Sequence, residues 1–61
     1  MSAEEAVMQI GAIRDQAQMM GANDSELPEL TDLMESVESG GDAHKALIRA
    51  QQILASKQDY H

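Results

Sequence analysis

The stretch AEEAVMQIGAIRDQAQMM, residues 3–20, decides the fold of this 61-residue chain. Its apolar positions recur at alternating intervals of three and four, which is the spacing of one buried face of a bundle helix. Ser2 and Glu5 form an S-x-x-E capping box before this stretch, and Gly21 suits the left-handed position that ends a helix. We therefore expect a helix over about residues 3–20, with Ala3, Ala6, Ile10, Ile13, Ala17 and Met20 on its buried face and Val7 beside them.

Two further helices are predicted after this one. The second covers about residues 26–39 and is capped by Ser25, with Pro28 in the first turn, where a missing N–H costs nothing. The third covers about residues 43–58 and is capped by Asp42. Both segments are rich in Ala, Leu, Met, Glu and Gln, which favour helix, and neither shows the alternation of a strand.

The connection around Gly40 and Gly41 is short enough to make the second and third helices an antiparallel hairpin. Residues 1–61 therefore read as a single all-α domain of three helices, with the long first helix packed across the hairpin. In such a hairpin we expect Glu35 or Asp32 to lie near Lys45 or Arg49.

The hydrophobic content predicts a thin core. Hydrophobic residues make up 43% of the chain, but nine of them are Ala, only 2% of all residues are aromatic, and there is no Cys. So small a chain without disulfides or a metal usually needs association to offset its conformational entropy. We therefore expect oligomerisation to complete the fold, most simply as a twofold homodimer.

A second apolar stripe lies on each of two helices, opposite the predicted buried face. A solvated monomer needs only one such stripe for each helix, although scattered apolar surface residues are also common. Met suits an adaptable contact, and Gly and Ala permit close approach of helices. The candidate interface, toward a second copy or another protein, consists of Met8, Gly11, Ala12 and Met19 on the first helix and Ile48 and Ala55 on the third.

The formal net charge of −7 belongs entirely to residues 23–42, because the charges of the two flanking segments cancel. Such a surface repels nucleic acid and anionic membranes, whereas a basic protein partner is compatible with it. Glu29, Asp32 and Glu35 lie opposite the Leu stripe of the second helix and form a candidate acidic docking face. The same residues also fit a solvated outer face or, less well, phosphate mimicry.

No motif for a metal, a cofactor or catalysis stands out. His44 and His61 lack zinc-ligand spacing, and a calcium loop beginning at Asp24 would place Glu29 where the sharp turn requires Gly. No nucleophile–base pair is evident either. We find no signal peptide and no apolar run long enough to span a membrane, and we expect a complete, cytoplasmic, non-enzymatic protein.

Residues 33–40, Leu-Met-Glu-Ser-Val-Glu-Ser-Gly, followed by Ala46-Leu47, resemble the helical hairpin of the small subunit of exodeoxyribonuclease VII. The resemblance covers about a third of the chain and uses a pattern common to helical hairpins. The acid-rich start of the second helix and the long first helix depart from that family, so we assign no family from it.

From these features we expect a small acidic interaction module that is homo-oligomeric or an accessory subunit of a larger complex. The alternative is an acidic inhibitor or antitoxin-like regulator that neutralises a basic site on a partner protein through the second helix.

Overall fold

The computed structural model describes residues 2–21 and 26–58, and it contains three α-helices in that part of the chain. They are α1 (Ala3–Met19), α2 (Glu26–Glu38) and α3 (Ala43–Gln58). The predicted all-α, three-helix fold is confirmed, and α1 and α2 each end one residue earlier than expected. No helix in the described ranges is long and apolar enough to cross a bilayer.

Side chains cap the starts of two helices, as predicted. The hydroxyl Oγ of Ser2 accepts a hydrogen bond from the backbone N–H of Glu5 at 3.1 Å. The Oδ1 atom of Asp42 accepts one from the backbone N–H of Lys45, also at 3.1 Å. Each bond satisfies a donor that has no partner within its own helix. The predicted cap at Ser25 lies outside the described residues.

Two adjacent glycines end α2 and form the turn of the hairpin. Gly40 has a φ of +99°, in the left-handed region, and its N–H donates to the carbonyl of Val37 at 3.0 Å. The N–H of Gly41 donates to the carbonyl of Ser36 at 2.8 Å, which completes a Schellman motif. A Cβ on Gly41 would lie 2.6 Å from the Ser36 Oγ. The turn therefore needs both glycines, for different reasons.

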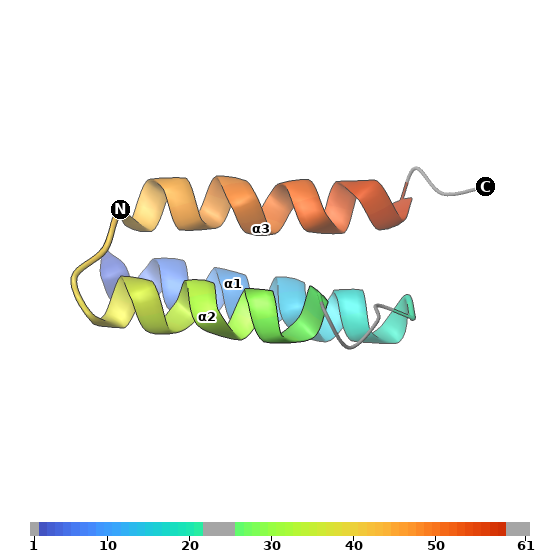
Figure 1. The fold of residues 1–61 in the computed structure, drawn as a ribbon, viewed down its shortest axis with the longest axis horizontal. Helices are drawn as coiled ribbons and strands as arrows, with labels where there is room; N and C mark the ends of the chain where they lie inside the picture. Colours follow the sequence, from blue (N-terminus) through green and yellow to red (C-terminus); the bar gives the residue numbers. More distant parts are fainter. Residues whose placement is uncertain (1, 22–25, 59–61) are drawn as a thin grey trace.

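The three helices lie lengthwise against one another, and each of them contacts the other two (Figure 1). In sequence order they run antiparallel, so α1 and α3 point the same way. The largest fully buried side chains are Ile10, Leu30 and Val37, one from α1 and two from α2. The remaining buried core residues are Ala6, Ala17, Ala46, Leu47, Ala50 and Ile53.

The buried face of α1 follows the predicted spacing in its central part only. Ile13 and Val7 pack against the core as half-buried side chains. Ala3 and Met20, the predicted ends of the face, are exposed instead, because they lie at the limits of the helix where the bundle no longer covers them. With four alanines among its buried residues, the core is as thin as the composition predicts.

Candidate interaction surfaces

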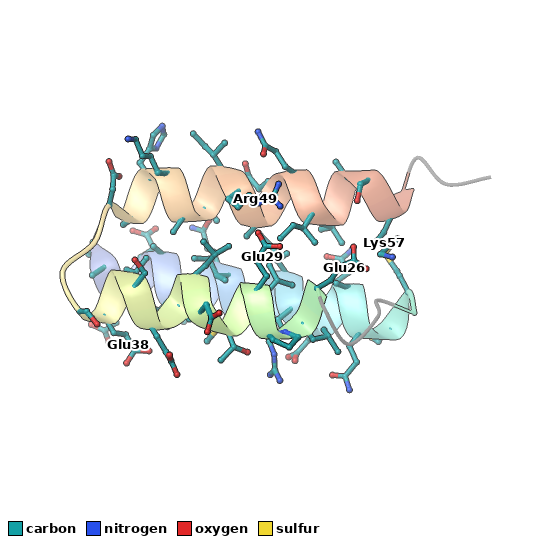
Figure 2. All side chains as sticks on the ribbon, viewed as in Figure 1. Glu26, Glu29, Glu38, Arg49 and Lys57 are labelled. Carbon is teal, nitrogen blue, oxygen red and sulfur yellow. The ribbon has the colours of Figure 1, made fainter. Side chains whose placement is uncertain are left out.

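Two ion pairs join α2 to α3. The Nε of Arg49 lies 2.7 Å from the Oε2 of Glu29, and the Nζ of Lys57 lies 2.7 Å from the Oε1 of Glu26. Figure 2 shows both glutamates of α2 directed toward α3. The hydrogen bond from Arg49 and the charge of Glu29 raise the pKa of Arg49 above its ordinary value. The seam between α2 and α3 is therefore held by ion pairs within the chain.

Neither Glu35 nor Asp32 forms the predicted pair with Arg49 or Lys45 among the described residues, and Arg49 pairs with Glu29 instead. The reason is angular. Successive residues of a helix turn by about 100°, which places Glu29 at the edge of the buried face of α2, beside α3. Asp32 and Glu35 project from the outer side of α2 and are exposed.

The candidate acidic docking face is consequently smaller than expected. Glu29 is half-buried and tied to Arg49, so its carboxylate is already partnered within the chain. Asp32 and Glu35 form no ion pair with any residue in the described ranges. Of the three predicted residues, these two alone present unpartnered carboxylates on the outer side of α2.

The outer face of α1, which we define by Met8, Ala12 and Met19, carries the most exposed large apolar side chains. Met8 is 70% exposed and Met19 is 88% exposed, and Ala12 between them is also exposed. The two methionines are about three turns apart, or ~16 Å along the helix axis. The structure therefore brings together three of the predicted interface residues on one face of one helix.

Gly11 does not belong to this outer face. It is half-buried, and a Cβ at Gly11 would lie 3.7 Å from the Cε of Met34 in α2. The close neighbour that Gly11 accommodates is thus a side chain of its own chain. Gly11 lies about 80° around the helix from the centre of the outer face, on the side of α1 that packs against α2.

The second predicted stripe, on α3, forms a separate surface. Ile48 is 41% exposed and Ala55 is exposed, both on the side of α3 opposite its buried residues. Because the three helices surround a common core, the outer faces of α1 and α3 point in different directions. One flat partner surface cannot cover both stripes at once.

A shallow apolar depression, which sequence reasoning missed, lies where α1 begins and α2 ends. It has a volume of about 270 Å³ and is lined by Ala3, Glu4, Val7, Met8 and Glu38. Four of these residues follow the i, i+1, i+4, i+5 spacing of one helix side, which was visible in the sequence. Their meeting with Glu38 depends on the alignment of α1 with α2, which the sequence pattern does not specify.

A second depression, of about 440 Å³, lies farther along the same seam, where α2 begins. Arg14 of α1 and Asp32 of α2 line it together with Leu27, Pro28 and Thr31. The Nε atom of Arg14 is buried and has no hydrogen-bond partner among the residues that the structure describes. The hydroxyl of Thr31 is occupied, since it donates to the carbonyl of Leu27 at 3.2 Å.

Residues 2–21 and 26–58 contain no group of three side chains able to hold a metal ion. His44 is exposed near the start of α3. The surfaces of this part of the chain offer apolar area next to carboxylates. Comparison of the chain with protein-family models, with curated proteins and with solved structures finds no significant match.

Proposed function

We propose that this chain is a small, non-enzymatic, cytoplasmic interaction module that forms a homodimer, alone or as an accessory subunit of a larger complex. The observation that carries the proposal is the exposure of Met8 and Met19, at 70% and 88%, on one face of one helix. Contiguous apolar patches on a small domain mark protein contacts, whereas apolar residues exposed singly are common.

The energetic reason is the size of the core. Burying a methionine side chain contributes about 1.5–3 kcal/mol, and a twofold dimer buries each residue of its interface twice. In an antiparallel pair of α1 helices, Met8 of one copy is level with Met19 of the other, and Ala12 lies near the twofold axis. The small Ala12 side chain lets the two helices approach closely.

The test is the molar mass of the M8E/M19E double variant in a sedimentation experiment at micromolar concentration. The proposal predicts a dimer for the unaltered protein and a monomer with intact helicity for the variant. The matched control is Q51E/Q52E, which adds two charges to exposed positions of α3 and should remain dimeric. Dimerisation should also survive about 0.5 M salt, because apolar burial is little screened.

A second candidate function is an acidic regulator that neutralises a basic site on a partner through α2. It is supported by the exposed carboxylates of Asp32 and Glu35, which form no ion pair with a described residue. A partner captured through these groups should be lost from a pull-down at about 0.5 M salt. The D32N/E35Q variant should lose it at low salt as well. Retention of the partner by this variant contradicts the regulator function.

A further inference from the structure

The depression between the start of α1 and the end of α2 combines an apolar lining with two carboxylates. Ala3, Val7 and Met8 supply apolar atoms, and Val7 also packs against the core from its half-buried position. Glu4 comes from α1 and Glu38 from α2, so the two charges reach the depression from different helices. Figure 2 places Glu38 at the end of α2, on the side away from α3.

These two carboxylates are not neutralised by the described cations. Arg49 and Lys57 are each committed to a glutamate on the seam between α2 and α3. Neither Glu4 nor Glu38 forms an ion pair with a described residue. A partner that fills the depression with an apolar side chain can therefore add one or two cations beside it.

We propose that this depression binds a basic amphipathic helix of another protein. An apolar side chain of that helix packs on Val7 and Met8, while Lys or Arg residues flanking it pair with Glu4 and Glu38. Such a helix presents apolar anchors at intervals of three and four with basic residues between them. This heterotypic contact goes beyond self-association and uses the side of α1 next to α2, which adjoins the outer face at Met8.

A second copy of this chain fits the depression less well than a basic protein. The described residues carry nine carboxylates and four cations, so a second copy has few cations to place beside Glu4 and Glu38. Two of the four cations are already paired within their own chain. Charge complementarity therefore selects a partner of opposite net charge.

The probe is a synthetic helical peptide of Leu and Lys, about 18 residues long, with Leu at intervals of three and four. Binding is measured by fluorescence anisotropy, and the site is located by amide chemical-shift changes in the full-length protein. We expect the largest shifts in residues 3–8 and 35–38. The E4Q/E38Q variant should bind the peptide about fivefold to tenfold more weakly than the unaltered protein.

The matched control is E5Q/D15N, which removes two charges from exposed positions of α1 that do not line the depression. Its affinity for the peptide should stay within about twofold of that of the unaltered protein. The proposal would be overturned if both variants lost the same affinity for the peptide, or if amide chemical-shift changes were spread evenly over all acidic residues. Binding would then follow net charge alone. The M19E variant should still bind the peptide even if it no longer dimerises, so failure of this site and failure of the dimer are distinguishable.

Discussion

The two long seams of the bundle that involve α2 differ in how their polar groups are satisfied. Between α2 and α3, two carboxylates meet two cations at 2.7 Å, and a two-glycine turn sets the register. Between α1 and α2, the described residues form no ion pair. That second seam instead holds two depressions, a buried Arg14 Nε without a partner, and the exposed Met8 at its rim.

This difference indicates where the molecule can meet other proteins. Two of the four basic residues of the chain pair with glutamates across the hairpin, so the seam between α2 and α3 has its own counterions. The side of α1 keeps its carboxylates unpaired and its methionines in solvent.

The largest effect is expected in the core that both seams share. Leu30 is fully buried, and L30A should lower the free energy of unfolding by about 2–5 kcal/mol, enough to leave so small a domain mostly unfolded. Urea denaturation followed by circular dichroism measures the loss. Ile48, which is 41% exposed, provides the control. The I48A variant should lose well under half as much unfolding free energy as L30A. Similar losses would mean that the core is not where the structure has it.

The next largest effect concerns the turn that fixes the hairpin. G40A forces a Cβ into a left-handed backbone and should cost about 1–2 kcal/mol of stability. G41A should also be destabilising, because its Cβ would lie 2.6 Å from the Ser36 Oγ and 2.7 Å from the Ser36 carbonyl oxygen. Thermal unfolding of the two variants measures this, and an unchanged melting temperature for both contradicts the described turn.

Gly11 allows a prediction of opposite sign on the seam between α1 and α2. Its added Cβ would make an ordinary contact 3.7 Å from the Met34 Cε, and Ala is a better helix former than Gly by about 1 kcal/mol. G11A should therefore raise the free energy of unfolding by up to that amount while leaving dimerisation unchanged. If G11A dimerises more weakly than the unaltered protein in sedimentation, Gly11 contributes to the dimer interface.

The smallest effect is expected at the ion pair between Lys57 and Glu26, whose side chains are 24% and 20% exposed. K57Q should reduce stability by about 0.2–1 kcal/mol at low salt. The difference from the unaltered protein should shrink at about 0.5 M salt, because added ions screen the pair. A salt-independent difference would show that Lys57 acts through packing of its aliphatic stem instead.

Local signals in the sequence were sufficient to predict the helices. The residues that begin and end the helices interact with backbone groups only a few positions away, so their roles can be read from the local sequence. They are Ser2, Asp42, Gly21 and Gly40. The exposure of Met8 and Met19 was predictable for the same reason, since the angle around a single helix places them opposite the core.

Features that depend on how two helices align could not be predicted in this way. Glu29 and Arg49 are twenty residues apart, and which carboxylate meets that guanidinium depends on the register of the hairpin and the rotation of α2. The proximity of Gly11 to the Met34 side chain could not be predicted, because Met34 belongs to another helix. The depression at Glu38 was missed for the same reason, as it exists only where α1 and α2 meet.

The most direct test of the proposed role of α1 is the sedimentation-equilibrium mass of the unaltered protein from about 1 to 100 micromolar. If the outer face of α1 is an interface, the mass should rise with concentration from 6.6 kDa toward twice that value. The M8E/M19E variant should stay at 6.6 kDa throughout. A constant mass of 6.6 kDa for the unaltered protein over the whole range would contradict self-association through α1.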